Sequence, residues 1–248
     1  MRKAVRKVLV VVGIAAIATA GSVTTSTAGV TSPADVASIQ PVSGQRVGVA
    51  IPVTVTFTQP ITNRDAAERT IAITSPATPA GSFTWLNNRV VQWNPMGFWP
   101  AHSNIIVTAG GAKTTFETGA AVKGVADIDA HTFTVSIDDQ VVREMPASMG
   151  KSKFPTPKGS FTALAKEKTV IMDSRTIGIP LSDPEGYKLT VSNAVRITGG
   201  GVYVHSAPWS VGSQGYANVS HGCINLSPDN AAWYFDTVRV GDPVIVQA

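Results

Sequence analysis

Short runs of alternating apolar and polar residues, separated by turn residues, constrain the fold of this 248-residue chain more than any other feature. Val53–Phe57 is the clearest case, because its apolar residues alternate with threonines, as in a strand with one buried face. Similar runs recur between residues 36 and 119, with Pro, Gly and Asn between them. About seven short strands within about 80 residues predict a β-sandwich, in which Arg64–Arg69 is the only helix expected.

The second half of the chain, residues 122–248, is also expected to be mainly β. Phe133–Ile137 alternates and is followed by a turn and by Val141–Arg143, which predicts a hairpin. Tyr203 and His205 alternate with valines, so their rings should share one face of a strand. A helix is predicted over Ser227–Phe235, since serine is a good N-cap and proline suits the first helical turn. The expected fold class is therefore mainly β with one or two short helices.

The charge of the chain is concentrated at its N-terminus. Hydrophobic residues make up 44% and charged residues 15% of the sequence, a balance typical of a chain that forms a core rather than a disordered one. Four of the 20 basic residues lie within Arg2–Lys7, and the remaining 16 match the 16 acidic residues. A nucleic-acid-binding protein would keep a basic face, so no nucleic-acid partner is predicted.

The N-terminal segment has the layout of an export signal. The basic Arg2–Lys7 is followed by the apolar Val8–Ile17 and then by small residues, which predicts a signal peptide over residues 1–28. The apolar run is shorter than the about 20 residues that cross a bilayer comfortably. The protein is expected to be exported to the periplasm or cell wall. Contact with the membrane is expected only if the signal stays uncleaved as an anchor, an alternative that the sequence leaves open.

Cys223 is the only cysteine of the chain. In an exported protein, a single thiol is buried and inert, engaged between molecules, or reactive. His205 and His221 are the candidate partners, because an imidazole that takes the thiol proton supplies the nucleophilic thiolate. Gly222 and the polar residues around Cys223 make a poor setting for an inert core cysteine. The pattern alone leaves catalytic and structural readings open.

The residues around Cys223 resemble a known catalytic signature. Ser220–Asn225 reads Ser-His-Gly-Cys-Ile-Asn, and it follows His205-Ser206 after an intervening stretch. With the upstream Thr156–Phe161, these segments resemble the catalytic domain of the L,D-transpeptidases over roughly residues 127–246. No departure from the family pattern occurs at the catalytic positions.

The first half of the chain is similar to a bacterial immunoglobulin-like domain. The similarity rests on Pro41–Gly44, on the strand pattern of Val53–Phe57 and on Trp93–Pro95. Besides the signal peptide predicted over 1–28, the two resemblances predict an immunoglobulin-like β-sandwich over 36–119 and a β-rich catalytic domain over 122–248.

The resemblance implies a role for each residue of the signature. Cys223 is the implied nucleophile and His205 its general base, while the backbone carbonyl of Ser206 orients the imidazole. The backbone amides around His221, Gly222 and Cys223 are the implied oxyanion donors. Whether His221 takes part in acid–base chemistry or holds the loop stays open.

The resemblance also implies substrate contacts and a mobile lid formed by residues 172–200. Asn225 is implied either to contact the substrate or to brace its loop. The implied substrate-binding residues are Met172, Tyr187, Gly201, Tyr203, Trp209 and Asn225. No metal and no cofactor is implied.

The implied reaction is a two-step acyl transfer in cell wall biogenesis. The thiolate of Cys223 attacks a peptidoglycan tetrapeptide stem at the carbonyl of its third residue and releases D-alanine. The side-chain amine of a diamino acid on a second stem then captures the acyl group, which gives a 3→3 cross-link. The same thiol chemistry suits carbapenem β-lactams as covalent inhibitors.

Three other interpretations are weighed against this one. His205, His221 and Cys223 are legitimate zinc ligands, although no Cys-x-x-Cys or His-Glu-x-x-His motif accompanies them. A non-catalytic wall-binding module would be expected to have lost the cysteine or the histidine. An L,D-carboxypeptidase, which passes the acyl group to water, cannot be separated from a transpeptidase by sequence.

Overall fold

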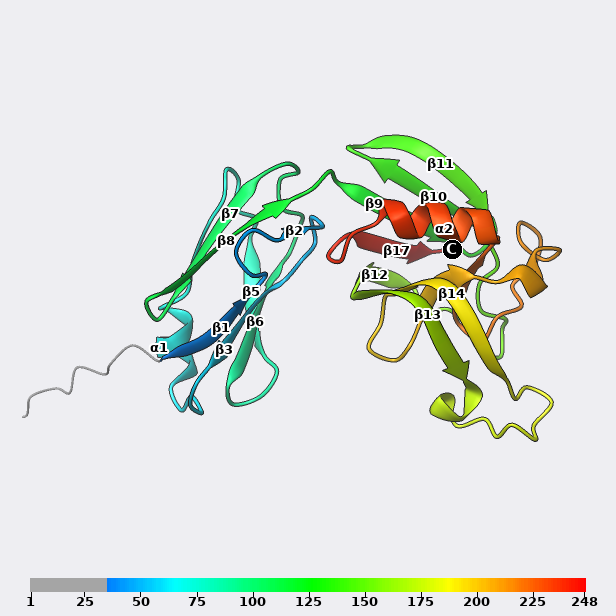
Figure 1. Cartoon of the computed structure of the whole chain (residues 1–248), viewed down its shortest axis with the longest axis horizontal. Coiled ribbons are helices and arrows are strands. Elements are labelled where there is room, and N and C mark those ends of the chain that lie inside the picture. The colour runs from blue at the N-terminus through cyan, green and yellow to red at the C-terminus, as the bar shows by residue number, and fades with distance from the viewer. Residues whose placement is uncertain (1–34) are drawn as a thin grey trace, which may run out of the picture. The chain divides into compact units, whose positions relative to one another are not determined.

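The computed structural model of the chain describes residues 35–248, so the predicted signal peptide lies outside the described part. Within that part, strands form most of the regular structure and two α-helices accompany them (Figure 1). The predicted mainly β fold class is confirmed. No helix among residues 35–248 has both the length and the apolar character needed to cross a membrane.

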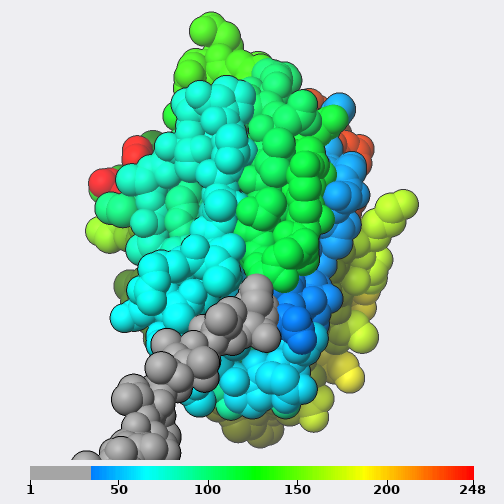
Figure 2. Space-filling view, turned by 90° about the vertical axis from the view of Figure 1, so that its left-hand side faces the viewer, coloured from blue at the N-terminus to red at the C-terminus, as the bar shows by residue number. Residues whose placement is uncertain are grey.

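The first half of the described chain consists of two four-stranded sheets. One sheet has the order β1 (Val36–Gln40), β3 (Val53–Phe57), β6 (Val90–Pro95) and β5 (Gly81–Trp85). The other has the order β2 (Arg46–Val47), β8 (Ala112–Thr118), β7 (Asn104–Ala109) and β4 (Ala72–Thr74). The short helix α1 (Arg64–Glu68) lies between β3 and β4 in the chain, where the sequence predicts it. Figure 2 shows the green strands β7 and β8 packed beside cyan residues of the same unit.

The alternation of β3 explains how this sandwich obtains its core. Val53, Val55 and Phe57 are at most 1% exposed, whereas the threonines between them are partly exposed. Trp99 is buried against Trp93, with ring centroids 5.1 Å apart. The apolar face of each sheet is thus covered by the other sheet, as the sequence pattern requires.

The second half of the chain contains two more sheets and the longer helix. A five-stranded sheet has the order β11 (Gln140–Pro146), β10 (Thr132–Ile137), β9 (Val122–Asp127), β17 (Pro243–Gln247) and β12 (Gly159–Thr162). A four-stranded sheet has the order β13 (Ala165–Asp173), β14 (Lys188–Arg196), β15 (Tyr203–Ser206) and β16 (Ile224–Leu226). The helix is α2 (Pro228–Thr237), and two 3-10 turns are η1 (Ser174–Ile177) and η2 (Pro208–Ser210).

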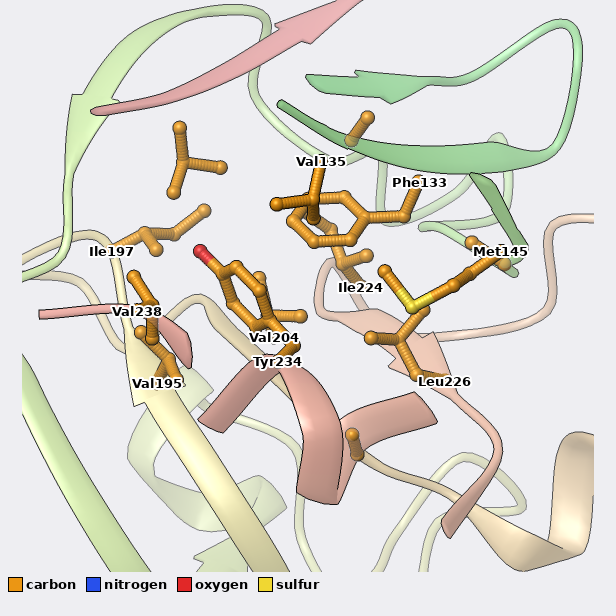
Figure 3. Packing of buried hydrophobic residues seen from close by; sticks show 14 of the residues in the cluster. Phe133, Val135, Met145, Val195, Ile197, Val204, Ile224, Leu226, Tyr234 and Val238 are labelled. Carbon is orange, nitrogen blue, oxygen red and sulfur yellow. The ribbon is translucent and has the colours of Figure 1, made fainter. Parts of the chain in front are cut away.

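Helix α2 begins where its capping residues predict. The side chain of Ser227 accepts a hydrogen bond from the amide of Asn230, and Pro228 is the first helical residue. The buried Tyr234 of α2 reaches into the core and meets Phe133 of β10 edge-on, with ring centroids 4.8 Å apart (Figure 3). Val204 and Ile224, from the neighbouring strands β15 and β16, complete this part of the core (Figure 3).

Strands β15 and β16 are parallel neighbours, and their register positions the candidate site. Val204 is paired with Ile224 and His205 with Asn225. Because successive side chains of a strand point to opposite faces, the burial of Val204 and Ile224 in the core turns His205 and Asn225 to the other face. Cys223, which directly precedes β16, points to that same face.

Candidate active site

The loop that carries Cys223 is held by hydrogen bonds from two sides. The Ser220 hydroxyl donates to the carbonyl of Cys223 at 2.6 Å and accepts from the amide of Gly222 at 3.1 Å. The buried Thr156 hydroxyl donates to the carbonyl of Gly222 at 2.9 Å and accepts from the amide of Gly150 at 2.8 Å. Gly222 adopts a φ of 116°, which favours glycine because the residue has no Cβ. The nucleophile loop, residues 220–223, is therefore held in place by these hydrogen bonds.

One of the three expected oxyanion donors is engaged in this conformation. The amide of Gly222 already donates to Ser220 Oγ, because the tight turn brings the serine hydroxyl over it. The role of the Gly222 amide as a donor to the substrate stays a prediction. The amides of His221 and Cys223 remain as candidate donors.

His205 is oriented by its neighbour in the chain. Its side chain is 2% exposed, and Nδ1 lies 2.8 Å from the carbonyl oxygen of Ser206. A carbonyl oxygen only accepts hydrogen bonds, so Nδ1 carries the proton and Nε2 of the neutral ring is an unprotonated base. The Trp209 ring lies beside the imidazole, at a centroid distance of 6.0 Å.

Both the thiol and the imidazole are held in their neutral forms. Burial lowers the pKa of His205 to about 4, against the opposing effect of the hydrogen bond to Ser206. Burial also raises the pKa of the Cys223 thiol to about 11. At neutral pH the resting pair is therefore thiol and imidazole.

Two cavities open onto Cys223. One, of about 320 Å³, is lined by His205, Trp209 and Asn225, and the other, of about 540 Å³, by Gly201, Gly222 and Tyr203. Both are lined by Met172, Tyr187, His221 and Cys223. All six predicted substrate-binding residues therefore line one cavity or both.

Asn225 lines the smaller cavity and is held by hydrogen bonds to two serines. Its Nδ2 donates to Ser210 Oγ at 3.1 Å, and its backbone exchanges hydrogen bonds with Ser148. Its Oδ1 is buried without a hydrogen-bond partner among the described residues. Of the two roles implied for Asn225, the bracing contact is therefore present, and one polar atom remains unpaired.

The region expected to form a mobile lid, residues 172–200, includes a long strand. Lys188–Arg196 forms the nine-residue strand β14, which pairs with β13 in antiparallel register from Asp173↔Lys188 to Ala165↔Arg196. Within 172–200, residues 174–187 and 197–200 lie outside the strands. The region expected to form the lid thus contains strand β14 as well as loop residues, and its mobility stays a prediction.

His221 lies at the centre of contacts that sequence reasoning missed. Its Nε2 is 2.9 Å from Glu185 Oε2, and Glu185 also pairs with Lys151. Its ring lies 4.8 Å from that of Phe154 and 4.9 Å from that of Tyr187. No motif marks Lys151, Phe154 or Glu185, since each lies in an irregular segment that reaches the site only through the tertiary path of the chain.

Thr156, in contrast, belongs to a segment that the sequence singles out. It opens the Thr156–Phe161 element, and its hydroxyl ties that element to the nucleophile loop. The structural reason for a threonine next to this loop is thus a pair of buried hydrogen bonds.

Comparisons with known proteins agree with this geometry. A family model described as the L,D-transpeptidase catalytic domain matches residues 122–246, and one described as a bacterial Ig domain matches residues 12–115. L,D-transpeptidase 1 of Mycobacterium tuberculosis is 58% identical over 249 residues, which cover 99% of each chain. The chain belongs to the L,D-transpeptidase family.

Solved structures of L,D-transpeptidases share the fold of the described chain. An L,D-transpeptidase from Mycobacterium smegmatis is 70% identical, with a TM-score of 0.83 over 87% of this chain and 100% of that one. An LD transpeptidase in complex with imipenem is 60% identical, with a TM-score of 0.82 over 86% of this chain and 99% of that one. The prediction of an L,D-transpeptidase with an immunoglobulin-like domain is confirmed.

The zinc interpretation concerns His205, His221 and Cys223. Within residues 35–248, no group of three or more His, Cys, Asp or Glu side chains is placed to hold a metal ion.

Proposed function

We propose that this L,D-transpeptidase forms 3→3 cross-links in peptidoglycan through a thioester on Cys223. The observation that carries the proposal is that the sulfur of Cys223 and the imidazole of His205 line one cavity. The donor is a tetrapeptide stem, attacked at the carbonyl of its third residue. The acceptor is the side-chain amine of a diamino acid on a second stem.

The hydrogen-bonding state of His205 supports its role as the base of acylation. With Nδ1–H bound to the Ser206 carbonyl, Nε2 takes the thiol proton as sulfur attacks the donor carbonyl. The protonated ring then gives that proton to the departing D-alanine nitrogen, which restores neutral His205. The amides of His221 and Cys223 stabilise the oxyanion of the tetrahedral intermediate between these two steps.

The two cavities support a reaction with two peptide substrates. They meet at Cys223, so one can hold the acyl-enzyme while the acceptor enters through the other. A carboxypeptidase needs room only for water beside the thioester. The carboxypeptidase alternative is not favoured, since the relatives found are named transpeptidases.

The division of labour within the chain is part of the proposal. The immunoglobulin-like unit, residues 36–119, and the catalytic unit, residues 122–248, each have a hydrophobic cluster of their own. Cys223 and His205 belong to the second unit, so we assign catalysis to it and placement in the wall to the first. The substrate requires export, which the predicted signal peptide over residues 1–28 would provide.

Carbapenems are the proposed covalent inhibitors, as the imipenem complex of a relative suggests. Attack of Cys223 on the strained lactam carbonyl uses the same base and oxyanion donors as attack on the stem peptide. The test is incubation with imipenem followed by intact-mass analysis. The unsubstituted protein should gain one drug mass, and Cys223→Ala should gain none. A drug adduct on the Cys223→Ala variant would disprove Cys223 as the nucleophile.

A further inference from the structure

Glu185 contacts His221, and neither the family signature nor the acylation step explains this contact. It lines neither cavity, yet its carboxylate receives both His221 Nε2 and the ammonium group of Lys151. The side chains of all three are largely withdrawn from solvent, with exposed fractions of 19% for His221, 26% for Glu185 and 29% for Lys151. Such a chain of ion pairs and hydrogen bonds is stronger than one at a free surface.

A tight turn at residues 183–186 fixes the backbone position of Glu185. The amide of Glu185 donates to Asp183 Oδ1 at 2.8 Å, and the amide of Gly186 donates to the carbonyl of Asp183 at 2.8 Å. A Cβ on Gly186 would lie 2.4 Å from the carbonyl oxygen of Pro180, so the turn closes too tightly for any other residue. The carboxylate therefore reaches His221 from a defined turn.

This contact decides which nitrogen of His221 is free. The carboxylate of Glu185 accepts from Nε2–H, since the pairing with Lys151 and His221 lowers the pKa of Glu185 and keeps it ionised. In the neutral ring, Nδ1 is then the unprotonated nitrogen. The rings of Phe154 and Tyr187 both pack near the imidazole, at centroid distances of 4.8 and 4.9 Å, and so restrict its rotation.

The position of His221 suits the second half of the reaction. His205 lines only the smaller cavity, whereas His221 lines both. His221 therefore lines the cavity that admits the acceptor, whichever of the two cavities that is. The acceptor arrives as an ammonium ion, because a side-chain amine of this kind has a pKa of about 10.4, and it must lose a proton before it can attack.

We infer that Glu185 is a positioning residue that holds His221 with Nδ1 free, so that His221 takes the proton from the acceptor ammonium group in the transfer step. The inference rests on the proposed function, since it concerns the amine acceptor. Nδ1 accepts one proton from the ammonium group and releases it to solvent. The neutral amine attacks the thioester carbonyl, so a C–N bond forms. His205 takes the second nitrogen proton, the C–S bond breaks, and the proton passes to the departing sulfur.

The experiment separates acylation from transfer in the full chain. Acylation is followed as mass gain with imipenem, and transfer as the rate of dimer formation from a disaccharide-tetrapeptide with a diamino acid at its third position. Glu185→Ala removes the contact, Glu185→Gln keeps an acceptor oxygen without the charge, and Glu144→Gln is the matched control at an exposed carboxylate on β11. Lys151→Met leaves the His221–Glu185 hydrogen bond in place.

Glu185→Ala should lower the transfer rate at pH 7 by about tenfold or more, in the range of a lost general base, and Glu185→Gln should lower it less. Acylation by imipenem should stay near the unsubstituted rate in both. The transfer defect should shrink as pH rises toward about 10, where the acceptor amine loses its proton without help. Glu144→Gln should transfer at nearly the unsubstituted rate, and Lys151→Met should lose less than Glu185→Ala, because the hydrogen bond between His221 and Glu185 stays in place.

Three results would overturn the inference. They are an unchanged transfer rate in Glu185→Ala, a loss of acylation equal to the loss of transfer, and a defect that stays constant with pH. A loss in Lys151→Met as large as that in Glu185→Ala would show that Glu185 merely anchors the lid. If the unsubstituted protein releases alanine without any dimer, it is the proposed function that fails.

Discussion

Asp242 gives this protein a dependence of stability on pH that can be worked out from its surroundings. The residue directly precedes β17 and is 0% exposed. Its Oδ2 accepts from the amide of Arg239 at 2.7 Å, but its Oδ1 is buried without a partner among the described residues. The hydroxyl of Tyr234 is buried and unpaired in the same way. Burial disfavours the charged carboxylate and outweighs the backbone amides of Arg239 and Val49 and the positive charges of Arg239 and Lys166, which favour it.

The size of this stability change follows from the shift in the pKa of Asp242. Burial raises the pKa of Asp242 from 3.8 to about 7. In the unfolded chain the carboxyl loses its proton near pH 3.8, whereas in the folded chain it keeps the proton until about pH 7. The folded state binds more protons across this window, so stability falls as pH rises from about 4 to about 7 and then levels off. The loss is on the order of 4 kcal/mol, at 1.36 kcal/mol per pKa unit.

The substitution Asp242→Asn removes the charge and keeps the shape of the side chain. Urea unfolding at a series of pH values between about 4 and 9 gives the free energy of unfolding of each variant. Asp242→Asn should gain on the unsubstituted protein steadily up to about pH 7 and keep that advantage above it. Asp139→Asn, at an exposed turn position with a φ of 65° that asparagine tolerates, is the matched control. A stability difference between Asp242→Asn and the unsubstituted protein that does not change with pH would refute the reasoning.

Three further predictions concern the site and its setting. Thr156→Val should destabilise the protein and slow acylation by imipenem, because two buried backbone groups lose their partner at about 1–3 kcal/mol each; Thr156→Ser should behave like the unsubstituted protein in urea unfolding and in the acylation assay. His205→Ala should lower the pre-steady-state rate of acylation by imipenem far more than His221→Ala, and the reverse order would exchange their roles. A chain of residues 120–248 should still acylate at Cys223 but melt at a lower temperature, since Val240 and Gly241 lose the amide hydrogen bonds of Gly48 and Ala50; a folded chain that fails to acylate would make the first unit part of the active site.

Local sequence pattern predicted the elements whose burial follows a simple period. The alternation of Val53–Phe57 corresponds to strand β3, and the cap at Ser227 with Pro228 fixes the start of α2. The hairpin around Asp138–Asp139 follows because both residues adopt positive φ, 48° and 65°, a conformation in which aspartate is tolerated. In each case the signal lies within a few neighbouring residues.

The candidate site was only partly predictable. Cys223 and His205 were named from residue type and motif, and the register of β15 with β16 turns both to one face. Glu185 carries no such signal, because its contact with His221 depends on the path of the lid. The engaged amide of Gly222 could not be foreseen either, since it depends on the rotamer of Ser220. The lid was expected from the family resemblance alone, and the strand β14 within it was not foreseen, since its exposed residues such as Lys188 give no clear alternation.

The central claim is that Cys223 carries an acyl group from one stem peptide to the amine of another. The most direct test is incubation of the protein with a disaccharide-tetrapeptide that has a diamino acid at its third position, followed by mass analysis of the products. The account predicts a dimer whose mass is that of two substrates less one alanine, and no dimer with Cys223→Ala. Alanine release without a dimer, or dimer formation by Cys223→Ala, would contradict it.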